Sequence, residues 1–139
     1  MASDVAHLIK VASNEISRGI NTFAHQFGLT GTQVQIIFFL SNRDKNTYQK
    51  DIEKEFNIRR PTATNILKTM EKDKLITRVA VEEDSRLKKI VLSAKSQTLE
   101  PKINQFMDDN NQKILSTLGT LERHSFVRAL KKIPQKLKK

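Results

Sequence analysis

The expected fold of this chain of 139 residues is decided by one stretch, Arg-Arg-Pro-Thr-Ala-Thr-Asn-Ile-Leu-Lys-Thr-Met at residues 59–70. Pro61 marks the start of a helix, because the N–H that proline lacks would be unpaired in the first turn anyway. The apolar residues that follow have the i, i+3, i+4, i+7 spacing of one helical face: Ala63, Ile66, Leu67 and Met70. This spacing predicts a helix that packs by one side.

The opposite side of this predicted helix carries polar side chains that donate hydrogen bonds. They are Thr62, Thr64, Asn65, Lys68 and Thr69, with Arg59 and Arg60 at the helix start. Such groups bond phosphate oxygens or base edges, and Arg and Asn make bidentate contacts in the major groove. We expect Arg59, Arg60 and Lys68 to clamp phosphates, unless one of the arginines binds a guanine instead. For an isolated helix, an ordinary solvated face would be the better interpretation.

The residues on either side favour DNA contact. Upstream, Tyr48, Ile52 and Phe56 recur every four residues, and Asn57-Ile58 then turns the chain. This pattern predicts a short helix followed by a tight turn, and with the next helix it forms a helix-turn-helix.

Downstream, the period changes from helical to alternating. Two alternating runs, 77–82 and 87–92, are separated by the acidic, turn-forming stretch Glu83-Asp84-Ser85-Arg86. Such runs predict a β-hairpin, and a hairpin directly after a helix-turn-helix makes a winged helix. The expected fold class is therefore mainly α with a small β-hairpin wing.

At this point the sequence resembles the MarR family of bacterial transcription regulators. The family's exit from its recognition helix is similar to residues 71–76, Glu-Lys-Asp-Lys-Leu-Ile. Its wing signature is similar to residues 84–93, Asp-Ser-Arg-Leu-Lys-Lys-Ile-Val-Leu-Ser. The family usually has Gly where Lys74 lies, which leaves the shape of this helix end open. Ser93 replaces the commoner Thr, and either hydroxyl can cap the next helix.

The resemblance also implies roles within the wing. Arg86 is expected to enter the minor groove, whose narrow form concentrates negative potential, with Asp84 orienting it or a neighbouring arginine such as Arg78. The alternative for Arg86 is a surface arginine in a hairpin. The complete predicted DNA-binding set is Arg59, Arg60, Pro61, Thr62, Thr64, Asn65, Lys68, Arg86 and Lys88.

Two helices are expected before the winged helix. The first has an apolar stripe from Val5 to Phe27, and Gly28 is a natural terminator. Residues 30–40 then begin with a capping-box pattern and continue with apolar side chains nearly all round. A helix of this kind is buried on most sides, so we place it at the centre of the fold.

Two more helices are expected after the wing. One begins at Ser93 and ends near Gly119, and Pro101 either kinks it or lies close to its true start. The other is an amphipathic helix over residues 121–133 that ends before Pro134.

A single domain over residues 1–139 is predicted from the length of the chain, with residues 30–93 as its DNA-binding lobe. The apolar stripes at both ends are longer than a winged helix needs, and unmatched apolar surface needs a partner. The simplest partner is a second copy, so we predict that residues 1–28 and 94–139 are dimerisation helices of a homodimer. Two-fold symmetry would place two recognition helices about one DNA turn apart, on a pseudo-palindromic site.

The formal net charge of +10 suggests a polyanionic partner. Residues 59–89 hold nine Lys or Arg against five Asp or Glu, and residues 121–139 hold seven against one. More than half of the excess therefore lies in the C-terminal helix and tail. These charges contact the DNA backbone, raise the field that speeds encounter, or merely solvate the end of a helix.

Several classes of protein and site are not expected. The chain has no Cys, hence no disulfide and no Cys-based zinc site, and no apolar run long enough for a membrane span. No targeting segment is expected, so the default compartment is the cytoplasm. The scattered His7, His25 and His124 are interpreted as surface or interface groups rather than metal ligands. No nucleophile and base pair and no phosphate-binding glycine loop is recognisable, so neither an enzyme nor a cofactor is expected.

Our hypothesis from the sequence is a homodimeric regulator that binds double-stranded DNA and most often acts by occluding a promoter. The resemblance implies a small amphipathic or phenolic effector between the dimerisation helices and the DNA-binding lobe. Its pocket walls would be Ile16, Ile20, Phe23, Phe38 and Phe39, although an aromatic-lined core has the same sequence. The competing hypothesis is a winged helix that binds protein or RNA, or a dimeric scaffold without an operator.

Overall fold

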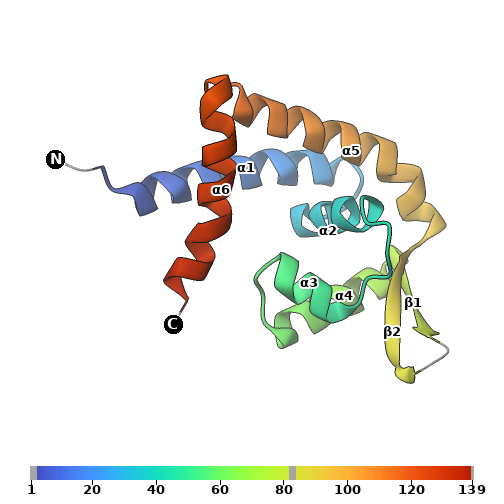
Figure 1. The fold of residues 1–139 in the computed structure, drawn as a ribbon. Helices are drawn as coiled ribbons and strands as arrows, with labels where there is room; N and C mark the ends of the chain where they lie inside the picture. Colours follow the sequence, from blue (N-terminus) through green and yellow to red (C-terminus); the bar gives the residue numbers. More distant parts are fainter. Residues whose placement is uncertain (1–2, 82–83, 139) are drawn as a thin grey trace. The chain divides into compact units, whose positions relative to one another are not determined.

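A computed structural model of the chain describes residues 3–81 and 84–138, with the backbone alone for Asp84 and Ser85. The elements in order are α1 (Val5–His25), α2 (Gly31–Ser41), α3 (Gln49–Glu55), α4 (Arg60–Lys72), β1 (Ile76–Val81), β2 (Asp84–Leu92), α5 (Ala94–Leu115) and α6 (Thr120–Leu137) (Figure 1). This is the predicted fold class, mainly helical with one hairpin. The chain divides into two compact units, Met1–Asn104 and Gln105–Lys139, with the boundary inside α5.

The core of the first unit is built around α2, as predicted. Val34, Ile36 and Ile37 are fully buried, because α2 is apolar on all sides and is covered by its neighbours. A capping box starts the helix: the Thr30 hydroxyl accepts from the Gln33 N–H at 3.1 Å, and the Gln33 side chain accepts from the Thr30 N–H at 3.0 Å.

The helix-turn-helix also forms where the sequence predicts it. Asn57 makes the turn between α3 and α4 with a φ of 51°, a left-handed conformation that asparagine tolerates. Pro61 lies in the first turn of α4. Leu67 and Met70 on α4 and Ile52 on α3 are fully buried, so the two helices share one apolar layer.

The wing is longer on its second strand than predicted. β1 and β2 pair antiparallel, with Ile76 opposite Leu92 and Val81 opposite Asp84, and the register shifts between Ala80 and Val81. The prediction that residues 84–86 belong to the turn was therefore wrong. A bulge lets one strand carry extra residues, so cross-strand pairing overrides the turn preference of Asp and Ser. Glu82, which was predicted to end the first run, and Glu83, which was assigned to the turn, lie outside the described residues.

The base of the wing is tied to the loops beside it. The Ile90 N–H donates to the Thr47 carbonyl at 2.7 Å, and the buried Ser96 hydroxyl donates to the Leu75 carbonyl at 2.7 Å. Ser93 caps α5, as predicted, because its hydroxyl accepts from the Ser96 N–H at 3.2 Å. These bonds hold the lower half of the hairpin against the helix-turn-helix.

Pro101 and Pro134 both lie inside helices. α5 begins at Ala94 and contains Pro101, so the alternative of a helix start close to Pro101 was wrong. α6 contains Pro134 and continues to Leu137, so the predicted end before Pro134 was also wrong. Proline has a φ compatible with a helix and removes one backbone hydrogen bond, which the turns on either side can tolerate. None of the described helices is long and apolar enough to cross a membrane.

The end of α4 uses a lysine where a glycine is usual. Lys74 has a φ of 60°, its N–H donates to the Glu71 carbonyl at 3.0 Å, and the Leu75 N–H donates to the Met70 carbonyl at 2.8 Å. This is the Schellman pattern of helix termination, in which the left-handed residue is most often glycine. The absence of glycine therefore leaves the geometry of this helix end intact.

Replacing this lysine by glycine is expected to stabilise the protein. Lys74→Gly should raise the free energy of unfolding by about 1 kcal/mol, because a side chain with a Cβ is disfavoured in the left-handed region. Urea denaturation at fixed protein concentration measures the change. Asn57→Gly is the matched control, with a smaller gain expected because asparagine tolerates a positive φ. A loss of stability in Lys74→Gly would contradict this account of the helix end.

Candidate nucleic-acid interface

α4 has the two faces that its sequence predicts. Ala63, Leu67 and Met70 are fully buried against the rest of the first unit. The exposed residues are Arg59 at the N-cap and Arg60, Pro61, Thr62, Asn65, Lys68, Thr69, Glu71 and Lys72 in the helix. The buried side anchors the helix, so the polar side is presented to solvent on a rigid element.

The threonines of α4 are not equivalent. The Thr69 hydroxyl donates to the Asn65 carbonyl of its own helix at 3.1 Å, so its proton is already used. Thr64 is half-buried, and its hydroxyl oxygen accepts a hydrogen bond from the side-chain amide of Gln49 at 2.8 Å. The Thr64 side chain therefore connects α4 to Gln49, the first residue of α3.

A hollow of about 540 Å³ opens between α3, α4 and the wing. Its lining brings together Arg60 and Thr64 of α4 with Arg86 and Lys88 of the wing. The remaining lining residues are Tyr48, Gln49, Lys50, Glu53, Arg78 and Leu87. Five cationic side chains and one carboxylate line the hollow, and such a concave, positively charged surface attracts phosphate groups.

Three polar residues of this hollow were missed by the sequence reasoning. Gln49, Lys50 and Glu53 all lie on α3, for which the sequence predicted only the apolar repeat Tyr48, Ile52 and Phe56. Their position on α3, the first helix of a helix-turn-helix, was the available signal. The predicted residues that do not line the hollow, namely Arg59, Pro61, Thr62, Asn65 and Lys68, lie on the exposed face of α4 or at its start.

Arg78 connects the wing to the helix-turn-helix. Its Nε lies 3.2 Å from Oε1 of Glu71 on α4, and its terminal NH1 donates to Oε1 of Gln49 on α3 at 3.5 Å. The Arg78 side chain is largely buried, which strengthens the attraction to Glu71 relative to a fully solvated pair. Glu71 was not predicted as a wing-positioning residue. The side chain of Asp84, which was, lies outside the described residues.

The residues predicted to line an effector pocket are distributed over α1 and α2. Ile20 is buried in the core of the first unit. The ring of Phe23 lies 5.1 Å from that of Phe27, and the ring of Phe39 meets that of Phe56 edge-on at 5.8 Å. These contacts belong to different parts of the first unit. Ile16 is exposed and Phe38 is half-buried.

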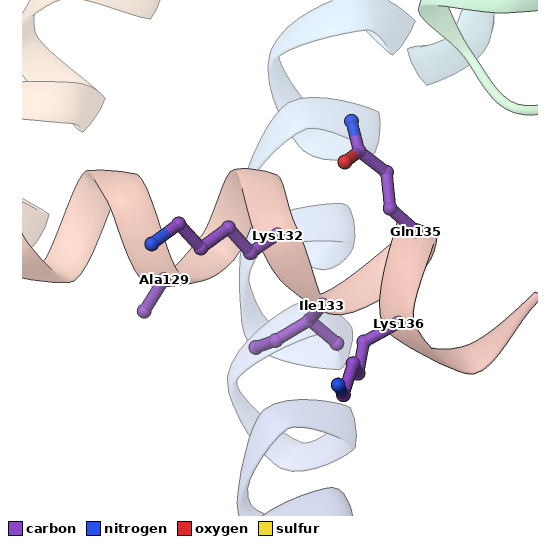
Figure 2. Close-up of a pocket in the computed structure, with 5 residues that line it drawn as sticks. All are labelled: Ala129, Lys132, Ile133, Gln135 and Lys136. Carbon is purple, nitrogen blue, oxygen red and sulfur yellow. The ribbon is translucent and has the colours of Figure 1, made fainter.

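Both terminal helices expose apolar side chains. On α1 these are Val5, Leu8, Ile9, Val11 and Ile16, and on α6 they are Leu121, Val127, Leu130 and Leu137. A hollow of about 610 Å³ along α6 is lined by Ala129, Lys132, Ile133, Gln135 and Lys136. Figure 2 shows Ala129 and Ile133 projecting from successive turns of α6, with lysine side chains beside them. Such amphipathic helices are typical of surfaces that pack against another chain.

Metal binding has no support in the part of the chain that the structure describes. There, no three His, Asp or Glu side chains are grouped closely enough to hold an ion. His7, His25 and His124 are all exposed, on α1 and α6.

Comparisons with known proteins place this geometry in a family. The model of the MarR family matches residues 27–87, which run from just after α1 into the second strand of the wing. The transcription regulator MarR from Oenococcus oeni PSU-1 is 38% identical, covers 95% of this chain and 99% of its own, and superposes with a TM-score of 0.88. No curated protein matches the sequence.

Two structures of S. aureus MepR are also similar. The MepR–DNA complex is 25% identical, with 99% of this chain and 100% of that chain covered and a TM-score of 0.87. MepR in its DNA-binding conformation is 26% identical, with 98% and 100% covered and a TM-score of 0.89. The similarity in each case extends over nearly the whole length of both chains.

Proposed function

Because the chain belongs to the MarR family of transcription regulators, we propose that it binds a specific double-stranded DNA site as a homodimer and represses transcription by occluding a promoter. The observation that carries the proposal is the hollow in which Arg60 and Thr64 of α4 lie beside Arg86 and Lys88 of the wing. A helix for the major groove and an arginine for the adjacent minor groove thus belong to one cationic surface.

Each part of this surface has a role in the proposal. The exposed Thr62 and Asn65 contact base edges in the major groove, since α4 presents them outward. Arg59, Arg60 and Lys68 bind phosphates, which position the protein without selecting a sequence. Arg86 enters the minor groove. The hydrogen bond of Arg78 to α3 and its ion pair with Glu71 on α4 hold the wing strand beside the helices.

The homodimer is proposed from the terminal helices. Leu8 on α1 is 56% exposed and Leu121 on α6 is 93% exposed, and exposed apolar groups recur along both helices. Burial of such stripes against a second copy removes apolar surface from water, which is the main driving force for association. A two-fold dimer would then place its two α4 helices one DNA turn apart, about 34 Å.

We also propose regulation by a small amphipathic or phenolic effector. The aromatic residues Phe23, Phe38 and Phe39 are half-buried rather than fully buried, so apolar side-chain surface remains accessible on α1 and α2. A ligand there would act by favouring one spacing of the two DNA-binding lobes over another, which requires different affinities for the two arrangements.

Selection from a random pool of DNA duplexes tests the proposed function. We expect an enriched pseudo-palindromic motif, bound at least about a thousandfold better than random duplex. Affinity should fall steeply as salt rises, because phosphate contacts release counterions. A pool that yields no motif would favour a protein- or RNA-binding module or a scaffold instead.

The wing makes a separate prediction. Arg86→Ala should weaken operator binding about tenfold, because it removes an arginine from a groove of concentrated negative potential. Fluorescence anisotropy with labelled operator measures the loss. Arg18→Ala is the matched control, since Arg18 is an exposed arginine on α1 that pairs with Glu15. Equal affinities for the two variants would show that Arg86 is a surface group without a role in binding.

A further inference from the structure

Gln49, the first residue of α3, forms side-chain hydrogen bonds to three elements. Its Nε2 donates to Oε2 of Glu53 on α3 at 3.3 Å and to the hydroxyl of Thr64 on α4 at 2.8 Å. Its Oε1 accepts from the guanidinium of Arg78 on β1 at 3.5 Å. Every polar atom of this side chain therefore has a partner within the protein.

The orientation of the Gln49 amide is determined by two of these partners. A carboxylate such as that of Glu53 only accepts hydrogen bonds, so it requires the amide nitrogen. A guanidinium such as that of Arg78 only donates, so it requires the amide oxygen. With both ends assigned, the second N–H of the amide is the one that points to Thr64.

This orientation decides what Thr64 offers to a ligand. A hydroxyl has one proton and two lone pairs, and the Gln49 amide occupies a lone pair of Thr64. Within the described residues, the Thr64 proton has no acceptor, whereas the proton of Thr69 is bound to the Asn65 carbonyl. Because Thr64 also lines the cationic hollow, its hydroxyl proton is available to donate to a group that enters there.

We infer that Gln49 is a specificity-determining positioning residue, which makes Thr64 a hydrogen-bond donor to one base edge of the operator. The inference rests on the proposed DNA binding. In the major groove, guanine and thymine present acceptors, whereas cytosine presents only its amino donor. At the base that Thr64 contacts, the protein should therefore prefer guanine or thymine to cytosine, by about tenfold.

An exchange of side chains between positions 49 and 53 tests this inference without changing the net charge. In the double variant Gln49→Glu/Glu53→Gln, the new carboxylate at position 49 still bonds Arg78 and accepts from the new amide at position 53. It can no longer donate to Thr64, so the Thr64 proton turns inward and its lone pairs face the DNA. We expect selection from a random pool to show one altered position, where cytosine or adenine gains about tenfold over guanine or thymine.

Three variants accompany the exchange. Glu53→Gln alone should keep the parent motif, because the donor at position 49 is retained. Thr64→Val should lose preference at that one position, and the exchange made in the Thr64→Val background should change nothing further. Gln49→Leu introduces an apolar side chain of similar size and should weaken the base preference at the same position of the motif. This variant tests the inference if the exchange variant does not fold.

The outcomes separate this inference from the proposed function. A parent motif that the exchange or Gln49→Leu leaves unchanged would overturn the inference and leave the proposed function standing. A loss of affinity that is equal for all sequences would overturn it too, since Thr64 would then contact a phosphate. A parent protein that selects no motif would overturn both.

Discussion

Leu8→Glu is expected to make the protein monomeric and to lower its affinity for a two-half-site operator by about 10²- to 10⁴-fold. Leu8 is exposed on α1 together with Val5 and Ile9, and in the proposed dimer this stripe is buried. An unpaired carboxylate is costly to bury, so the variant should not associate. Without the dimer, the second half-site no longer binds at high effective concentration. Sedimentation measures the association state, and anisotropy with full and half operators measures affinity.

Asn14→Glu is the matched control for this substitution. Asn14 lies on the opposite side of α1 from the stripe that contains Leu8, it is exposed, and the change in charge is the same. We expect this variant to remain dimeric and to bind the full operator like the parent. A Leu8→Glu protein that still sediments as a dimer, or a parent that is monomeric, would contradict the proposed assembly.

Leu67→Ala is expected to lower the free energy of unfolding by about 3 kcal/mol. Leu67 is fully buried between Ala63 and Met70 on the inner face of α4, so its truncation removes apolar contacts and leaves a cavity. The midpoint of urea denaturation should fall while its slope stays constant. The comparison requires a fixed protomer concentration, because association contributes to the stability of a homodimer.

Substitution of the next residue, Lys68, is expected to affect DNA binding rather than stability. Lys68 is exposed on the outer face of α4, so Lys68→Ala should change the free energy of unfolding by no more than about 0.5 kcal/mol. It should weaken DNA binding uniformly across sequences and reduce the salt slope by about one. Similar stability losses in the two variants would show that the two faces of α4 are wrongly assigned.

Much of the fold was predictable because its signals are local. The i, i+3, i+4, i+7 spacing of residues 63–70 and the proline before them are properties of one helix. The Thr30 hydroxyl accepts from the N–H of Gln33, three residues later. The Ser93 hydroxyl likewise accepts from the N–H of Ser96. Such features depend on neighbours along the chain, which a sequence displays directly.

The errors arose at residues whose local preference did not determine the structure. Asp84 and Ser85 are typical turn residues, yet they belong to β2, where Val81 pairs with Asp84. Pro134 is a typical helix breaker, yet α6 continues to Leu137. In both places, the contribution of one residue's local preference was too small to determine the structure.

The sequence by itself determined a helix-turn-helix with a polar outer face, a following hairpin and apolar terminal helices, because hydrophobic period and turn residues specify these elements locally. Only the tertiary structure decided which polar side chains meet in the hollow. Gln49 bonds Thr64 and Arg78, which lie 15 and 29 residues away in the sequence. The physical reason is that such bonds depend on how α3, α4 and β1 pack together, and the pattern of any one segment does not contain that information.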